Sequence, residues 1–298
     1  MTATAAVDVR GLVKRFGRFA AVDGLDLTVA PASVHGFLGP NGAGKTTTIR
    51  TLLGLYRAGA GTVRVLGRDP ARAAAAITRR TSYVPGDVSL WPNLTGQQCL
   101  DALAGLRGAR DEAAERRLAT DFAIDLRKTV RAYSKGNRQK VLLIAAFAAP
   151  SELLVLDEPT SGLDPLMEEV FRRQVRAAAA AGRTVLLSSH ILSEVEQLCD
   201  AVTIVKDGRL VESGPLAQLR HLAASRITAS VGAADLIGLR AELDGFGVVD
   251  AGGLTLSVPR PQVPSVLAVL ARSGAADITC TPASLEDLFL RHYEVAAR

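Results

Sequence analysis

The chain has 298 residues, of which 48% are hydrophobic and 22% are charged. This balance excludes a disordered chain, because it supplies enough apolar side chains for a core, and the length allows one large and one small domain. Lys and Arg outnumber Asp and Glu by 35 to 30, a net charge of +5, without any dense basic run. We therefore favour an arginine-rich surface over a nucleic-acid-binding patch and expect no nucleic-acid partner.

The cysteines and the apolar segments predict the compartment. Cys99, Cys199 and Cys280 are scattered without metal-ligand spacing, which is typical of reduced residues in a cytosolic protein. The N-terminal residues lack the charged-then-apolar pattern of a signal peptide. The longest apolar stretch, residues 141–149, is far shorter than the roughly 20 residues that span a bilayer. We expect no transmembrane segment, so that any membrane process would need another chain to do the spanning.

The first elements in chain order are two strands with a loop between them. Residues 7–10 and 25–29 alternate as half-buried strands do. Phe16 is expected in the intervening loop. An aromatic ring at that place can stack on a purine, and ordinary core packing is the equal alternative.

A glycine-rich loop follows an expected strand at 34–38 and precedes an expected helix at 47–53. It reads Gly39-Pro40-Asn41-Gly42-Ala43-Gly44-Lys45-Thr46-Thr47 and fits the pattern of glycine, four residues and Gly-Lys-Thr. The glycines let the backbone N–H groups point inward, and the new helix adds its positive N-terminus, so that a polyphosphate fits there. Lys45 can reach the β- and γ-phosphates, Thr46 can offer its hydroxyl to Mg²⁺, and Thr47 can meet the α-phosphate. A turn without function is the alternative, which the strand-loop-helix context disfavours.

Two further strands, a loop and three helices are expected next. The strands are 61–66 and 79–84, and the loop 85–95 contains Trp91, either as a lid on the core or as a contact for a partner. Helical spacing of apolar residues predicts helices over 97–106, 112–122 and 136–149. Ser134 is a suitable N-cap for the third helix, and Ser134 with Gly136 at a helix N-terminus would make a second anion site. An ordinary cap is the alternative reading of the same residues.

The strand 153–156 is a continuous apolar run, as in the centre of a parallel sheet, and it ends at two acids. Carboxylates at that end point into the ligand crevice of an open α/β sheet, so Asp157 can hold Mg²⁺ and Glu158 can polarise a water that attacks the γ-phosphate. A turn and a helix to residue 181 follow, and then another buried strand at 184–188. His190 comes just after that strand, and it could donate to the γ-phosphate or be structural. A helix at 191–199 and strands at 201–205 and 209–212 close the domain.

The order of these motifs resembles the ATP-binding cassette of ABC transporters over about residues 5–220. The resemblance implies a P-loop α/β cassette, with a central mainly parallel sheet, an antiparallel β part and a helical subdomain at about 96–150. It implies ATP and Mg²⁺ as ligands and ATP hydrolysis as the activity. Phe16 would stack on adenine, residues 39–47 would be the Walker A loop, 153–158 would be Walker B with the catalytic Glu158, 161–164 would be the D-loop, and His190 would be the switch histidine.

Residues Ser134-Lys135-Gly136-Asn137-Arg138-Gln139 resemble the family signature, which caps the γ-phosphate of ATP held by the opposite cassette. This implies a homodimer, or a paralogue as partner, with Ser134, Gly136 and Asn137 at the nucleotide. Lys135 and Asn137 replace the usual glycine and glutamine of the signature. Gly86 stands where the family's glutamine loop has its glutamine, which leaves the coupling to a membrane partner in question.

The remaining residues, 225–298, are expected to form a small α+β domain. Strands are expected at 226–231, 246–249, 254–258 and 277–280, with helices at 233–243, 263–272 and 284–290. We expect contact with a dimer partner or permease in preference to a ligand sensor. This tail resembles the ATPases of two-component ABC-2 exporters of the daunorubicin-resistance type. The resemblance implies a peripheral protein at the cytoplasmic face of the membrane. It also implies that the protein drives a separate permease, which exports a hydrophobic drug or antibiotic. The alternatives are a non-transport ABC ATPase and an ATP-dependent docking module with weak turnover.

Overall fold

The computed structural model describes residues 4–222, 225–231, 239, 242–243, 246–250 and 253–281. The chain divides into two compact units, Met1–Gly214 and Pro215–Arg298. Within the described residues, no helix combines the length and the apolarity that a crossing of the bilayer requires.

A six-stranded sheet forms the centre of the first unit. Its strand order is β5-β6-β7-β3-β8-β9, and the neighbours from β5 to β8 are parallel. Every residue of β3, β6 and β7 is buried, because helices or a second sheet cover both faces, and this explains their continuous apolar sequences. The strands are β3 (Val34–Leu38), β5 (Thr81–Val84), β6 (Leu153–Asp157), β7 (Thr184–Ser189), β8 (Ala201–Lys206) and β9 (Arg209–Pro215).

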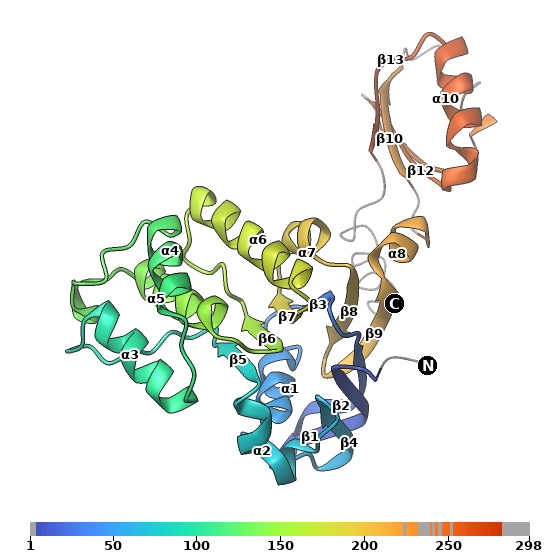
Figure 1. Cartoon of the computed structure of the whole chain (residues 1–298). Helices are drawn as coiled ribbons and strands as arrows, with labels where there is room; N and C mark the ends of the chain where they lie inside the picture. Colours follow the sequence, from blue (N-terminus) through green and yellow to red (C-terminus); the bar gives the residue numbers. More distant parts are fainter. Residues whose placement is uncertain are drawn as a thin grey trace. The chain divides into compact units, whose positions relative to one another are not determined.

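An antiparallel sheet packs on one side of this centre, with α1 between the two sheets (Figure 1). Its order is β2-β1-β4, with β1 (Val7–Phe16), β2 (Phe19–Val29) and β4 (Ala60–Val65). Helices α1 (Lys45–Leu52) and α2 (Pro70–Thr78) adjoin it. Helix α2 is not among the predicted helices, because its alanine-rich sequence shows no clear apolar stripe. Its start carries the usual signals, with Asp69 as N-cap and Pro70 in the first turn.

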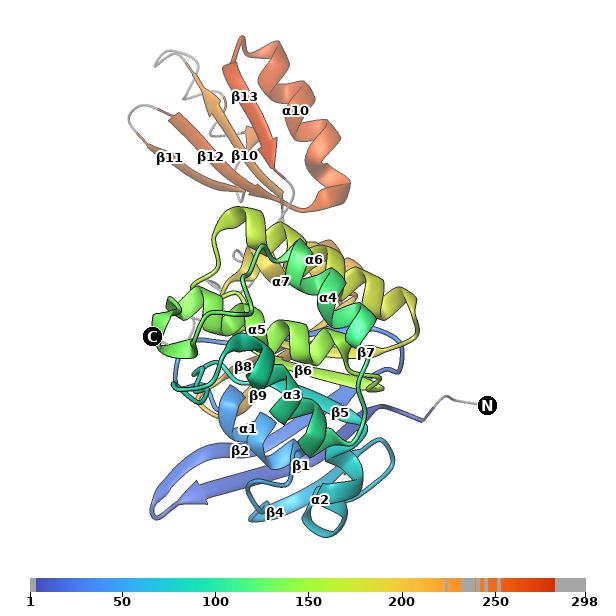
Figure 2. The same ribbon diagram turned by 60° about the vertical axis from the view of Figure 1, so that its left-hand side comes forward.

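The opposite face of the central sheet is covered by α6 (Pro165–Ala180) and α7 (Leu192–Leu198), as Figure 2 shows. Three further helices lie beside β5 and form the expected helical part: α3 (Gly96–Arg107), α4 (Glu112–Asp121) and α5 (Lys135–Ala148), with a 3₁₀ turn, η1, at Val130–Ala132. Helix α5 buries ten residues, Gln139 to Ala148, so it is the core element of this group.

Two arginines satisfy the carboxyl end of α5. Arg183 donates to the carbonyl oxygens of Phe147 and Ala146 at 2.8 and 3.1 Å. Arg107 of α3 donates to the Ala145 oxygen at 3.1 Å. Burial, and to a smaller extent the nearby charge of Arg107, lowers the pKa of Arg183 to about 10. These bonds fix the far end of the helix whose N-terminus carries the candidate second anion site.

The second unit is an antiparallel sheet with its own core. The strand order is β11-β12-β10-β13, formed by β10 (Ser225–Ser230), β11 (Gly247–Asp250), β12 (Gly253–Val258) and β13 (Ala276–Thr281). Helices α8 (Leu216–Leu222) and α10 (Val263–Arg272) belong to it, with a 3₁₀ turn, η2, at Arg260–Gln262. Alternate residues of β10 and β12, such as Ile227 and Leu256, pack with Leu270 of α10. The helix expected over 284–290, and most of the one expected over 233–243, lie outside the described residues.

The predicted fold class is confirmed. The expected strands and helices that fall on described residues exist, and most of their ends agree with the structure to within a few residues. One placement is wrong: Phe16 does not lie in a loop but is the last residue of β1, because that strand runs six residues beyond Arg10 to a tight turn at Gly17.

Candidate functional site

The register of the central sheet brings the candidate residues to one edge. Leu38 at the end of β3 pairs with Ser189 of β7, and Asp157 at the end of β6 pairs with Ser188. Because these three strands are parallel, the residues that follow them emerge at the same carboxyl edge. Those residues are the phosphate loop, Glu158 and His190, and the last two lie more than 100 positions beyond the loop in the sequence.

The loop 39–44 turns so tightly that glycine is required at two points. Gly44 has φ +96°, and a Cβ there would lie 2.5 Å from the Ala21 oxygen. A Cβ on Gly39 would come within 2.4 Å of the Val205 oxygen. Helix α1 begins at the next residue, Lys45, so its first N–H groups face the loop without intrahelical partners. The loop therefore provides a concave anion site, with a pocket of about 270 Å³ lined by Phe19, Ala21, Pro40, Asn41, Gly42, Ala43, Gly44, Lys45, Thr46, Thr47 and Glu158.

Lys45 places a buried positive charge in the middle of this loop. Its side chain is 5% exposed, and its Nζ donates to the carbonyl oxygens of Gly39 and Pro40 at 2.6 and 3.2 Å. Burial lowers the pKa of Lys45, while the charges of Glu158 and Asp157 oppose the shift. A cation with so little water around it binds an anion strongly, which suits the phosphates of a nucleotide.

Asp157 and Thr46 provide oxygen atoms next to the loop. The Thr46 hydroxyl donates to Asp157 Oδ2 at 2.9 Å, and the Ser188 hydroxyl donates to Asp157 Oδ1. Asp157 is 2% exposed, so these hydrogen bonds hold its carboxylate in one orientation. Hydroxyl and carboxylate oxygens are ligands that Mg²⁺ prefers, so the pair would suit a magnesium ion.

Glu158 lies between two groups that carry or can carry positive charge. Its Oε1 is 3.4 Å from Lys45 Nζ, and its Oε2 is 3.4 Å from His190 Nδ1. Its backbone has φ +48°, a conformation that costs a non-glycine residue about 1–3 kcal/mol. Ser188 stabilises this conformation, because its carbonyl and hydroxyl oxygens both accept from the Glu158 N–H, at 3.1 and 3.2 Å. Glu158 is thus held at the mouth of the phosphate pocket, where a carboxylate can act as a base.

The candidate second anion site lies at the N-terminus of α5. Ser134 is the N-cap, and its hydroxyl accepts from the Asn137 N–H at 3.2 Å, as predicted. A Cβ on Gly136 would lie 2.3 Å from the Gly162 oxygen, so this helix start is pressed against the turn that follows Glu158. None of Ser134, Gly136 and Asn137 is among the described residues that line the phosphate pocket. One copy of the chain therefore does not bring the two candidate anion sites together.

Lys135 does not simply add positive charge to that helix start. Its Nζ donates to the Ser161 hydroxyl at 2.8 Å and so links α5 to the 159–164 turn. Gln139 of the same helix is fully buried and donates to the Pro159 oxygen at 2.8 Å. Two side chains of α5, Lys135 and Gln139, therefore hold the helix to the turn.

Gly86 lies against the end of β6. A Cβ there would be 3.1 Å from the Asp157 oxygen and 3.7 Å from Glu158 Cβ. The main chain thus approaches the acidic pair closely at the position where the family resemblance implies a glutamine. A side chain at this position would require Asp157 to shift by a few tenths of an ångström.

The aromatic residues of the β1–β2 hairpin have contacts that the sequence does not indicate. Phe16, which was expected to stack on adenine, packs edge-on against Tyr56, with ring centroids 5.4 Å apart. Phe19 of β2, which the sequence analysis does not single out, lines the phosphate pocket. Ser188 is a second residue that it misses, although a polar residue near the end of a buried strand is a usable signal.

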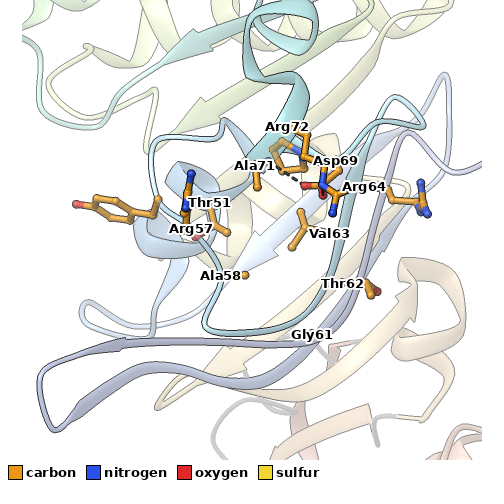
Figure 3. Close-up of a pocket in the computed structure, with 12 residues that line it drawn as sticks. Thr51, Arg57, Ala58, Gly61, Thr62, Val63, Arg64, Asp69, Ala71 and Arg72 are labelled. Atoms are coloured by element: carbon orange, nitrogen blue, oxygen red, sulfur yellow. Dashed lines mark hydrogen bonds and ion pairs between the residues drawn. The ribbon is translucent and has the colours of Figure 1, made fainter.

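A larger cavity, of about 430 Å³, lies between the residues after α1, strand β4 and the start of α2 (Figure 3). Arg57 stands on one side of it beside Thr51, and Arg72 stands on the other beside Asp69, 3.7 Å away. Asp69 offsets part of the positive charge, and the arginines do not converge on one point. None of the described residues of the phosphate loop lines this cavity, so it is not the nucleotide site.

Comparisons with known proteins agree with this geometry. The sequence model described as ABC transporter matches residues 22–161. A daunorubicin resistance ATP-binding protein of Streptomyces coeruleorubidus is 38% identical, over 97% of this chain and 96% of that protein. The Nod factor export ATP-binding protein I of Burkholderia lata is 34% identical over 96% of both. A solved structure, of an ATP binding subunit of an ABC transporter, superposes with a TM-score of 0.68 and 30% identity over 74% of this chain and 93% of that one.

Proposed function

This chain belongs to the ATP-binding subunits of ABC transporters, which hydrolyse ATP to drive transport, and we propose that it powers the export of a hydrophobic, drug-like compound through a separate membrane permease. The observation that carries the site assignment is the convergence of Lys45, Asp157, Glu158 and His190 at one sheet edge. The cargo class is supported by the likeness to daunorubicin resistance proteins over nearly the full length of the chain.

Each residue has a role that follows from its place. The N–H groups of residues 39–47 and the ammonium of Lys45 would hold the phosphates. Thr46 and Asp157 would hold Mg²⁺, which offsets the charge on the phosphate oxygens when it is bound. Glu158 would accept a proton from the attacking water, and His190, 3.4 Å from Glu158, would donate a hydrogen bond to the γ-phosphate. Phe16 is 45% exposed and would stack on the adenine with its free face.

We further propose that two copies close head to tail over two nucleotides. Support comes from the second anion site, because Ser134 is exposed and lies outside the phosphate pocket of its own chain. A helix N-terminus with an exposed serine suits a phosphate that another copy presents. The protein would then work as a homodimer, bound peripherally at the cytoplasmic face of the membrane.

A shallow apolar groove of about 290 Å³ supports a place for the permease. Leu53, Leu55, Leu103 and Leu106 line it together with Tyr83, and Leu55 and Leu106 are 63% and 80% exposed. Large apolar side chains with this exposure are costly in water, and an apolar helix of a membrane protein would cover them.

The test compares the purified wild-type chain with Glu158→Gln. We expect wild type to hydrolyse MgATP and the variant to lose turnover by about a hundredfold or more while it still binds MgATP, because the amide cannot accept the proton. The variant should elute as a dimer with MgATP and as a monomer without it. A non-transport ATPase would hydrolyse ATP without any response to the co-expressed permease. A docking module with weak turnover would show little difference between wild type and the variant.

The cargo requires a transport assay in cells that contain the chain and its own permease. Cells with wild type should accumulate less daunorubicin than cells with Glu158→Gln. Equal accumulation would exclude daunorubicin as the cargo. It would favour Nod factors, the cargo that appears in the name of the Burkholderia lata relative.

A further inference from the structure

The hairpin of β1 and β2 places two phenylalanines opposite each other, and one of them, Phe19, lines the phosphate pocket. Phe16 and Phe19 are directly paired across the turn at Gly17. Residues paired in this way project from the same face of the ribbon, with their Cβ atoms about 4.5–5.5 Å apart. Strand β2 also contacts α1, the helix that begins at the phosphate loop (Figure 1).

The two rings have different surroundings. Phe16 is partly covered, because Tyr56 contacts it edge-on and Lys14 Nζ lies 5.1 Å from its ring centroid. Phe19 is 65% exposed, and within the described part of the chain no ring contact is recorded for it. Phe19 is also the aromatic residue among those that line the phosphate pocket. The ring that lines the phosphate pocket is therefore the more exposed of the two.

We propose that Phe19 is a second nucleotide-contacting residue, whose ring packs against the adenine base, so that the paired Phe16 and Phe19 hold the base together. The inference rests on the proposed binding of ATP at the 39–47 loop. A base that covers Phe19 removes a large apolar surface from water, whereas the phosphates alone would leave it exposed. Stacking carries no hydrogen-bond readout, so Phe19 raises the affinity for a base without selecting adenine over guanine.

The test measures the affinity of the full chain for two probes by calorimetry: MgATP, which has a base, and magnesium tripolyphosphate, which has none. We expect Phe19→Ala to weaken MgATP binding by roughly five- to a hundredfold, the range for loss of one base–aromatic stack, and to change tripolyphosphate binding by less than about twofold. MgGTP should lose affinity by the same factor as MgATP. Leu210→Ala, which removes another exposed apolar side chain on β9, should leave both affinities unchanged.

Two results would overturn the proposal. Unchanged MgATP affinity in Phe19→Ala would show that the ring does not touch the nucleotide. An equal loss for MgATP and tripolyphosphate would show that Phe19 only supports the shape of the loop. Phe19→Leu, which keeps an apolar side chain without a ring, serves the same comparison if Phe19→Ala does not fold.

Failure of the proposed function gives a different pattern. If wild type binds neither probe, or if Lys45→Ala does not weaken the binding of magnesium tripolyphosphate, the 39–47 loop is not a phosphate site and both proposals are wrong. If Lys45→Ala abolishes tripolyphosphate binding and Phe19→Ala spares MgATP, only the role of Phe19 is excluded.

Discussion

Ser188 is the residue that holds the two acidic residues of the site, and Ser188→Ala tests this. It is fully buried, its hydroxyl donates to Asp157 Oδ1, and the same oxygen accepts from the Glu158 N–H. Loss of a hydrogen bond to a charged group costs about 1.5–3 kcal/mol, and the Glu158 N–H keeps its other acceptor, the Ser188 carbonyl. We therefore expect the first unit to lose about 2 kcal/mol of unfolding free energy. We also expect kcat to fall about tenfold, because Asp157 loses one of the two hydrogen bonds that fix its orientation and keeps only the one from Thr46.

Urea unfolding measures the first quantity, followed by the fluorescence of Trp91, the single tryptophan of the chain, which lies in the first unit. Ser82→Ala is the matched control. Ser82 is 1% exposed, and its hydroxyl pairs at 2.8 Å with that of Ser151, a neutral partner that also accepts from Arg183. The control should lose only about 1 kcal/mol and keep its turnover. If Ser188→Ala unfolds and hydrolyses ATP like the control, the serine does not organise the acidic pair.

Three further predictions concern stability and coupling. Burial lowers the pKa of His35 from 6.5 to about 4, so on acidification the unfolded chain takes up a proton before the folded chain does, and the unfolding free energy should fall by roughly 3 kcal/mol between pH 6.5 and 4. In urea unfolding, His35→Gln should lose less unfolding free energy over that pH range. An identical loss in the variant would contradict a role for His35. Arg183→Met should lower the unfolding free energy by about 3 kcal/mol, because it leaves carbonyl groups at the end of α5 unpaired. Its control, Arg173→Met on the exposed side of α6, should change the unfolding free energy by less than about 0.5 kcal/mol. Lys135→Met should change the unfolding free energy by less than about 1 kcal/mol, since the residue is exposed. In steady-state assays it should lower kcat a few-fold and leave KM unchanged, because Lys135 holds the turn through Ser161. A change in KM alone would refute that link.

The phosphate loop and the acidic pair could be predicted from the sequence because their signals are local. A glycine loop between a strand and a helix specifies its own geometry, and an apolar run that ends in two acids specifies a strand whose carboxyl end is polar. Parallel pairing then brings such ends together without any knowledge of register. His190 follows the same rule, since it comes directly after β7.

The roles of Phe19, Ser188 and Lys135 depend on contacts between segments far apart in the chain. The tight turn at Gly17 places Phe19 opposite Phe16, and a strand of 11 residues replaces the short strand that alternation predicts. The contact of Ser188 with Asp157 requires the register of β6 on β7, which periodicity does not supply. Lys135 reads from the sequence as a charge at a helix start, and only its distance to Ser161 shows that it holds a turn.

The turn between Glu158 and Asp164 joins the two candidate anion sites within one chain. At its start, Glu158 is kept in a left-handed backbone conformation by Ser188 and lies near Lys45. Its later residues are fixed to α5, because Gln139 donates to the Pro159 oxygen and the Gly162 oxygen leaves no room for a Cβ on Gly136. A left-handed residue costs about 1–3 kcal/mol, so the two hydrogen bonds from the Glu158 N–H to Ser188 must offset that cost to keep Glu158 in place. The turn therefore connects the carboxylate beside one phosphate site directly to the helix that we propose caps the phosphate of the other copy.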